Sequence, residues 1–430
     1  MNGLKRLVRR YGVLMSNVGA RVGALIVAAV TTFIVARTGG AALVGVLALL
    51  RVLPGLVGVV MSSGLPGSVT YFRAGPHRDD ARLPLTIVAI VVAGGAVGAA
   101  VWTAASSLVG PHLFPNLSPA LVLFAALLVP TKLCVATSKA CLQGNDDLPG
   151  ANRVIFFEEF MFLPAYGLLW LTGLHTHVAL VAGLMLADVA TASFGWARLT
   201  KRGFFAGRRR PSPALARRVA AYGMRAQVGG VMSLLNLRLD FVLLSLLTGP
   251  AVLGVYAVAS KFAELVKVPG MALTYVLYPR FAREGATAAA KARAMLPKAA
   301  VLTLGVVAPL WVATFLLPVV YGADFKAAVL PAQIILFGLM LEGVSGVVSG
   351  FLYGVGRPGL NSWAMAAGLA VTVVLDLVLI PPYGATGAAI ASAAAYVTMQ
   401  VTLVWFFFAL RRAGRDGRGW AEKAVGADAR

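Results

Sequence analysis

The chain has 430 residues, of which 59% are hydrophobic and only 13% are charged, and its mean hydropathy is +0.83. An average soluble domain has roughly 45–50% apolar and about 25% charged residues. So few charges cannot cover this much apolar surface in water, which excludes an ordinary soluble enzyme, a disordered protein and a disulfide-bonded scaffold. The composition predicts an all-α polytopic membrane protein.

Apolar stretches that can cross a membrane follow one another along the whole chain. The hydrocarbon core needs about 20 apolar residues per helix. Twelve stretches meet this requirement, at residues 12–36, 41–63, 83–108, 118–141, 154–173, 178–199, 219–247, 251–279, 299–320, 328–353, 360–380 and 386–410. The eighth is long enough to consist of two pieces. The first is too long for a signal peptide and has no cleavage signature, so we expect it to be retained.

The basic residues indicate the orientation of these spans. With the N-terminus in the cytoplasm, the inside segments carry 27 Lys and Arg residues, and the outside loops carry only Arg37 and Lys326. This asymmetry follows the positive-inside rule and explains most of the net charge of +22. We therefore predict a plasma-membrane protein with both termini in the cytoplasm. Its basic segments are expected to contact anionic lipids of the inner leaflet, and not nucleic acid.

The sequence divides into two halves of six spans. The longest inside connection, residues 201–218, is rich in charge, Gly and Pro and predicts a basic linker. It separates an N-terminal six-helix lobe at 1–200 from a C-terminal six-helix lobe at 219–410, which a basic cytoplasmic tail at 411–430 follows.

Short similar segments support this division. TGGAALVGV from Thr38 resembles TGPAVLGV from Thr248, at an offset of about 210 residues. An even number of spans per half predicts a parallel repeat around a pseudo-twofold axis, the plan of transporters that alternate access to a central cleft. Chance similarity in a chain rich in Gly and Ala is the alternative.

Some cations are predicted to lie deep in the membrane. Arg21, Arg51 and Lys261 are nine or ten residues from the nearer face, which is about 15 Å at 1.5 Å per residue in a core about 30 Å thick. A cation at that depth costs at least about 2.5–3.5 kcal/mol, so it should face a partner or a wet cavity.

The charges of the spans predict an anionic substrate. The spans contain the acids Glu158, Glu159, Asp188, Asp240, Glu264, Glu342 and Asp376. The first two spans of each half carry two of these, Asp240 and Glu264, together with the cations Arg21, Arg51, Arg225, Arg238, Lys261 and Lys267. This surplus of cations suits a phosphate or diphosphate, and structural ion pairing is the alternative for any one residue.

Local spacing suggests some of the pairs. Glu264 lies three residues from both Lys261 and Lys267, so these side chains can meet on one helix stripe. Arg238 and Asp240 are two residues apart, so each needs a partner elsewhere. Glu158 and Glu159 are adjacent and point to different helix faces, where buried pairing is favoured over a proton site.

Other chemistry is not indicated. The sequence has no GxxxxGK[ST] loop, so no ATPase is built in, and its four histidines lie near loops in no metal-binding pattern. Cys134 and Cys141 are interpreted as small buried side chains. We expect no enzymatic activity, no cofactor and no metal.

Several segments resemble one family. Residues 237–282 are similar to its seventh and eighth helices, YGADFKAAVLPAQIILFG from Tyr321 to the start of the tenth, and residues 354–359 and 377–396 to the eleventh and twelfth. Residues 34–57 are similar to the first hairpin. The family is that of the polysaccharide and lipid-linked oligosaccharide flippases, in the multidrug/oligosaccharidyl-lipid/polysaccharide (MOP) exporter superfamily. Asp376 departs from its pattern, in which Asn is more usual.

The resemblance implies two six-helix lobes around a MATE-like V-shaped cleft. It implies translocation of a polyprenyl-(di)phosphate-linked oligosaccharide to the outer leaflet for cell-surface polysaccharide biosynthesis. The cleft cations of the family would correspond to Arg21, Arg51, Arg225 and Lys261, with Arg238, Asp240, Glu264 and Lys267 in supporting or ion-coupling positions. A monomer is expected, with polysaccharide polymerase or assembly proteins as further partners.

Two alternatives remain. A multidrug or cation antiporter of the same fold would need acids for cationic drugs. A membrane-embedded glycan polymerase or transferase would need a large outside loop with catalytic groups, whereas the outside loops here are short and carry almost no charge.

Overall fold

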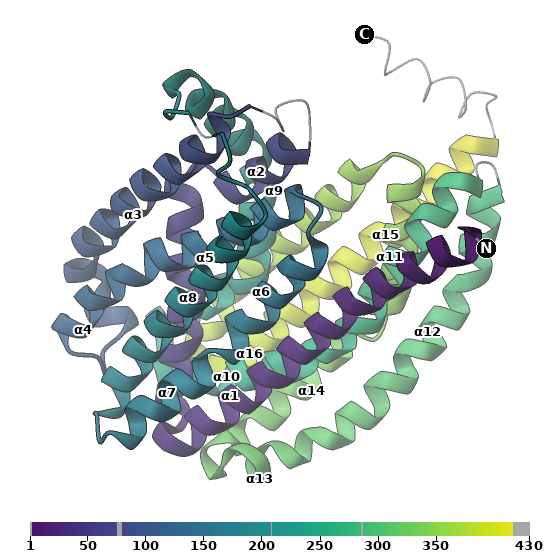
Figure 1. Cartoon of the computed structure of the whole chain (residues 1–430). Helices are drawn as coiled ribbons and strands as arrows, with labels where there is room; N and C mark the ends of the chain where they lie inside the picture. Colours follow the sequence, from purple (N-terminus) through teal and green to yellow (C-terminus); the bar gives the residue numbers. More distant parts are fainter. Residues whose placement is uncertain (1, 75–79, 208, 285–286, 416–430) are drawn as a thin grey trace. The chain divides into compact units, whose positions relative to one another are not determined.

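The computed structural model describes residues 2–74, 80–207, 209–284 and 287–415 (Figure 1). The described residues form helices and connecting turns without a β-strand, which confirms the predicted all-α class. The contacts divide the chain into two compact units. Unit 1 comprises Met1–Val231 and Gly249–Gly254, and unit 2 comprises Met232–Thr248 and Val255–Arg430. The assignment of the lobes to 1–200 and 219–410 stays a prediction.

The helices agree with the predicted spans. Unit 1 contains α1 (Asn2–Met61), α2 (Leu65–Ala74), α3 (Leu83–Leu113), α4 (Pro119–Phe124), α5 (Leu128–Gly144), α6 (Leu148–Phe160), α7 (Phe162–Leu171), α8 (Thr176–Lys201) and the first part of α9 (Pro213–Thr248). Unit 2 contains the end of α9, most of α10 (Pro250–Ala263), α11 (Lys267–Glu284), α12 (Ala288–Ala313), α13 (Leu317–Tyr321), α14 (Val329–Gly338), α15 (Glu342–Gly354) and α16 (Pro358–Arg415). All twelve predicted stretches fall on helical segments, and the long eighth one is divided by a 3₁₀ turn at Glu264–Val266.

Two of these helices are each a pair of helices joined at a glycine. The backbone leaves the helical region at Gly40, with φ 66°, and at Gly384, with φ 53°. Left-handed φ values are accessible to glycine at little steric cost. The breaks separate predicted spans 1 and 2 in α1, and predicted spans 11 and 12 in α16.

Length and apolarity support a multi-pass membrane protein. Among the described residues, seven helical segments are long and apolar enough to cross a membrane, or eight if the bent pair Ala323–Gly338 and Glu342–Gly354 is one span. Two of the seven, Gly19–Met61 and Gly359–Leu410, contain the glycine breaks and hold two predicted spans each. The total of twelve crossings stays a prediction.

The two similar glycine motifs contact each other within unit 1. A Cβ added to Gly45 of α1 would lie 1.9 Å from the carbonyl oxygen of Pro250, and one added to Gly254 of α10 would lie 1.8 Å from that of Ala41. A Cβ atom at either distance would force the backbone to move. The backbones of α1 and α10 can therefore approach this closely only because both positions are glycine. Small residues at membrane-helix interfaces allow this kind of packing.

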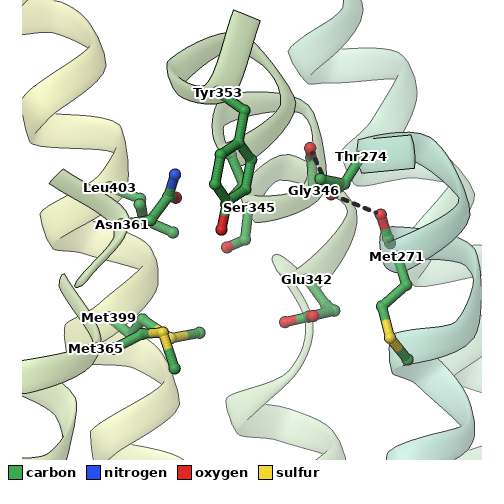
Figure 2. A pocket seen from close by; sticks show the side chains of 12 residues that line it. Met271, Thr274, Glu342, Ser345, Gly346, Tyr353, Asn361, Met365, Met399 and Leu403 are labelled. Carbon is green, nitrogen blue, oxygen red and sulfur yellow. Dashed lines mark hydrogen bonds between the residues drawn. The ribbon is translucent and has the colours of Figure 1, made fainter. Parts of the chain in front are cut away.

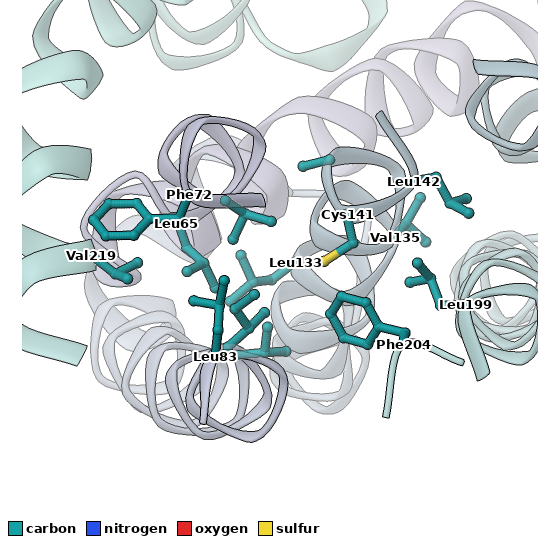
Figure 3. Packing of buried hydrophobic residues seen from close by; sticks show 14 of the residues in the cluster. Leu65, Phe72, Leu83, Leu133, Val135, Cys141, Leu142, Leu199, Phe204 and Val219 are labelled. Carbon is teal, nitrogen blue, oxygen red and sulfur yellow. The ribbon is translucent and has the colours of Figure 1, made fainter. Parts of the chain in front are cut away.

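Each unit has its own apolar core. In unit 1, side chains of α2, α3, α5 and α8 form a cluster that includes Leu65, Phe72, Leu83, Leu133 and Cys141 (Figure 3). Cys141 is fully buried there and Cys134 packs at its edge, both as free thiols, in agreement with the interpretation from sequence. The core of unit 2 lies between α11, α12, α15 and α16.

Candidate functional site

Arg51 of α1 is held in unit 1 by an acid and an aromatic ring. Its guanidinium forms an ion pair with Glu159 of α6 and lies 5.6 Å from the ring centroid of Phe162. The Arg51 side chain is 13% exposed and that of Glu159 is 29% exposed. Both side chains are therefore partly exposed, although the pair lies within apolar helices.

Two lysines of α5 are paired in the same unit. Lys132 binds Asp188 of α8 at 3.1 Å, and Lys139 binds Glu158 of α6 at 3.0 Å. The lysines are seven residues apart, which is about two turns, so they lie on one face of α5. That face meets α6 and α8, which lie beside α5 (Figure 1).

These pairs change the expected charge balance of unit 1. The surplus of cations came from counting only the first two spans of each half, which omits the acids Glu158, Glu159 and Asp188 of predicted spans 5 and 6. Arg51 is thus neutralised by a neighbouring span. The adjacent acids Glu158 and Glu159 bind different cations, which agrees with their expected pairing role.

For the other expected cleft cations, the structure gives the helix and the degree of burial. Arg21 is exposed on α1, and Lys261 is half-buried near the end of α10. The side chain of Arg225 lies outside the described residues.

In unit 2, Arg238 and Glu264 form a pair. Arg238 of α9 donates to Glu264 at 3.3 Å, and its guanidinium lies 4.9 Å from the ring centroid of Phe241. Lys267 donates to the Tyr396 hydroxyl at 3.1 Å, with its ammonium 4.2 Å from that ring centroid. Glu264 and Lys267 thus bond to residues of other helices. The expected meeting of Glu264 with Lys261 and Lys267 along one helix stripe stays a prediction.

Two further acids of unit 2 lie deep in the helices. Asp240 accepts from the Tyr256 hydroxyl at 2.5 Å and from the backbone N–H of Phe241 at 2.8 Å, with the Ser392 hydroxyl at 3.4 Å. Asp240 therefore finds its partners away from Arg238, as its spacing predicted. Asp376 of α16 is fully buried, and neither carboxyl oxygen has a hydrogen-bond partner among the described residues.

Sequence reasoning left Asp376 and Glu342 outside the candidate site. The signal was present, because an ionisable residue within an apolar span is itself an indication of function. In the part of the chain that the structure describes, no group of three or more His, Cys, Asp or Glu residues is arranged to hold a metal ion.

Asp147, outside the spans, joins α6 to the end of α8. Its carboxylate accepts from Arg198 at 2.5 and 2.9 Å and caps α6 through the Gly150 N–H at 3.1 Å, with Arg202 at 3.2 Å. Burial alone would raise the pKa of Asp147, but the hydrogen bonds from Arg198 and Gly150 outweigh it and hold the pKa below its ordinary value.

The stability of this junction should depend on pH. A carboxyl whose folded-state pKa is lowered stabilises the fold at pH values above its unfolded pKa, and this stabilisation is lost as the pH falls through the folded pKa. We expect Asp147→Asn to lose about 2 kcal/mol at neutral pH, from charge-assisted bonds to Arg198. Thermal unfolding in detergent at pH 7 and pH 3 measures this. If Asp147→Asn lowers the stability as much at pH 3 as at pH 7, the expected pH dependence is wrong.

Comparison with known proteins agrees with this architecture. A family model described as polysaccharide biosynthesis protein matches residues 14–284. An uncharacterized membrane protein of Methanocaldococcus jannaschii is 26% identical over 202 residues, which are 45% of this chain and 40% of that protein. The match thus spans less than half the length of this curated relative.

Solved structures share the fold. An inward-facing MATE family multidrug resistance transporter of the MOP superfamily has a TM-score of 0.67 and 16% identity, over 90% of this chain and 95% of that one. The lipid II flippase MurJ, in an inward closed conformation, has a TM-score of 0.68 and 14% identity, over 91% and 86% of the two chains. At these identities the likeness establishes the fold.

Proposed function

The chain belongs to the polysaccharide biosynthesis protein family, and from this we propose that it is a flippase for a polyprenyl-(di)phosphate-linked oligosaccharide. It moves the substrate from the cytoplasmic to the outer leaflet of the plasma membrane for cell-surface polysaccharide biosynthesis. The observation that carries the proposal is the family match over residues 14–284. The fold shared with transporters and the cations held inside apolar helices support it.

The physical task is to move a polar head through hydrocarbon. A hydroxyl that leaves water without a new hydrogen bond costs several kcal/mol, and an isolated charge costs far more. A polar passage with cations supplies partners for the sugar and the phosphate while the prenyl chain stays in lipid. Alternation between two arrangements of the lobes then exposes the head to each side in turn.

The ion pair of Arg51 and Glu159 is suited to open when the substrate binds, so that Arg51 binds the phosphate in place of the Glu159 carboxylate. A guanidinium binds phosphate through two parallel hydrogen bonds, and a diphosphate carries more negative charge than the carboxylate that it displaces. Glu159 keeps Arg51 neutralised when no substrate is present, which avoids an unpaired cation in the membrane. The empty transporter can therefore return to the inside-facing state without moving an uncompensated charge.

The membrane potential should drive the transport. An inside-negative potential of 100 mV favours the outward movement of one negative charge by about 2.3 kcal/mol, which shifts the equilibrium between the leaflets about 50-fold. We expect proteoliposomes with an imposed inside-negative potential to accumulate the lipid-linked glycan in the outer leaflet. Equal distributions with and without the potential would contradict movement of a net negative charge.

A second candidate is a multidrug or cation antiporter of the same fold. Two observations favour it, the MATE-like fold and the buried Asp376 carboxyl, which has no hydrogen-bond partner among the described residues. Transport of a lipophilic cation, with no transport of the polyprenyl diphosphate, would establish it.

A further inference from the structure

Unit 2 contains a cavity that the charged pairs described above do not form. Its volume is about 510 Å³, within the usual range for small-molecule sites, and it lies between α11, α15 and α16. Figure 2 shows Glu342, Ser345 and Tyr353 of α15 and Asn361 of α16 around this space, with the thioethers of Met365 and Met399 below them.

Buried polar atoms of the lining lack partners. Neither the oxygen nor the nitrogen of the Asn361 amide has a hydrogen-bond partner among the described residues, and the same holds for the Ser345 hydroxyl and for Oε2 of Glu342. Asn361 is 6% exposed and Ser345 is 4% exposed. Unpaired buried polar groups are costly, so their presence in one cavity indicates an occupant that bonds to them.

The hydrogen-bonding character of these atoms limits the occupant. Glu342 Oε2 and Asn361 Oδ1 need donors, Asn361 Nδ2 needs an acceptor, and the Ser345 hydroxyl takes either. A phosphate offers mainly acceptors and leaves Glu342 Oε2 and Asn361 Oδ1 without a donor. A quaternary ammonium offers no donor, and a primary ammonium offers no acceptor for Asn361 Nδ2. Neighbouring hydroxyls on a ring offer both, and the C–H faces of such a ring pack against methionine.

The cavity lies where a substrate would be loaded. Tyr353 and Asn361 flank the turn at Gly356–Arg357, which the basic-residue distribution places on the cytoplasmic side. Tyr353 is 42% exposed, so the cavity reaches the surface at that end. The proposed function also takes up its lipid-linked substrate on the cytoplasmic side.

We propose that this cavity binds one hydroxylated sugar ring of the glycan head, through Asn361, Ser345 and Glu342. The phosphate and the sugar would then be recognised by different groups of the chain. The inference rests on the proposed function for its lipid-linked ligand, but the binding of a free sugar can be tested without any lipid.

The first experiment measures sugar binding alone. Ser349, which lines the cavity, is changed to cysteine in a chain carrying Cys134→Ala and Cys141→Ala, and its reaction with a maleimide is followed. We expect methyl glucoside at millimolar concentration to slow the reaction, and Asn361→Leu to weaken this protection about tenfold through the lost hydrogen bonds. Val374→Leu, a change of an exposed side chain of α16 outside the cavity lining, is the control and should protect like the parent chain. Absence of protection, equal protection in Asn361→Leu, or stronger protection by a lipophilic amine overturns the inference.

The second experiment separates the two proposals. Native mass spectrometry compares retention of polyprenyl diphosphate with and without one attached glucose. We expect the parent chain to retain the glycosylated lipid about tenfold better, and both Asn361→Leu and the milder Ser345→Ala to lose this preference but keep the bare diphosphate. Retention of both lipids without preference overturns the sugar site alone. Protection by methyl glucoside with retention of neither lipid supports the sugar site and contradicts the proposed function.

Discussion

Arg51→Ala is expected to abolish flipping while the protein is still produced and inserted. The substitution removes charged hydrogen bonds to phosphate worth about 1.5–3 kcal/mol, which is roughly 10- to 150-fold in binding. It also leaves the partly exposed carboxylate of Glu159 to repel the substrate. The flipping rate in proteoliposomes measures the effect, and Lys261→Ala is expected to give the same loss. Full activity in both variants would contradict the assignment of these cations to the substrate path.

Glu159→Gln is the matched control for Arg51→Ala. It breaks the same ion pair but keeps the guanidinium, so we expect stronger retention of polyprenyl diphosphate and slower release. Opposite effects of the two variants on retention show that the pair acts on the substrate. If both variants lower retention equally, the pair stabilises the fold only.

Lys132→Ala is expected to destabilise the protein strongly. Its partner Asp188 is only 3% exposed, so the variant leaves a buried carboxylate without its cation. Removing one partner of a buried ion pair costs about 3–5 kcal/mol. The thermal unfolding midpoint in detergent and the yield of folded protein measure this loss. An unchanged midpoint would show that Asp188 is already compensated by other groups.

The double variant Lys132→Leu with Asp188→Leu distinguishes a structural pair from a functional one. Replacing a whole buried pair by apolar side chains of similar volume is often neutral or stabilising. We therefore expect the double variant to recover both stability and flipping. Recovered stability with lost flipping would place this pair, like Arg51 and Glu159, in the transport path.

The sequence was sufficient for the all-α class and for the positions of the helical segments because hydropathy and turn-forming residues are local properties. The twelve apolar stretches coincide with helical segments, and the division of α1 and α16 was visible as gaps between predicted spans. The 3₁₀ turn at Glu264–Val266 divides the long eighth stretch, but 3₁₀ turns at Ala125–Leu127 and Thr314–Leu316 also divide the fourth and ninth stretches, where the sequence predicted no division.

The charged sites were less predictable because their partners lie on helices distant in sequence. Arg51 meets Glu159 after 108 residues, and Lys132 meets Asp188 after 56. A charge count over the first helices of each half cannot include these acids. The cavity beside Asn361 was missed for a related reason, since its lining comes from three helices and uncharged side chains supply much of its polarity.

The most direct test of the proposed flippase function is native mass spectrometry of the purified protein with a polyprenyl diphosphate and a lipophilic cation offered together. We predict selective retention of the diphosphate, and loss of that retention in Arg51→Ala. Selective retention of the cation would contradict the flippase assignment and would make Asp240, Glu264 and Asp376 the residues to test in a cation exporter.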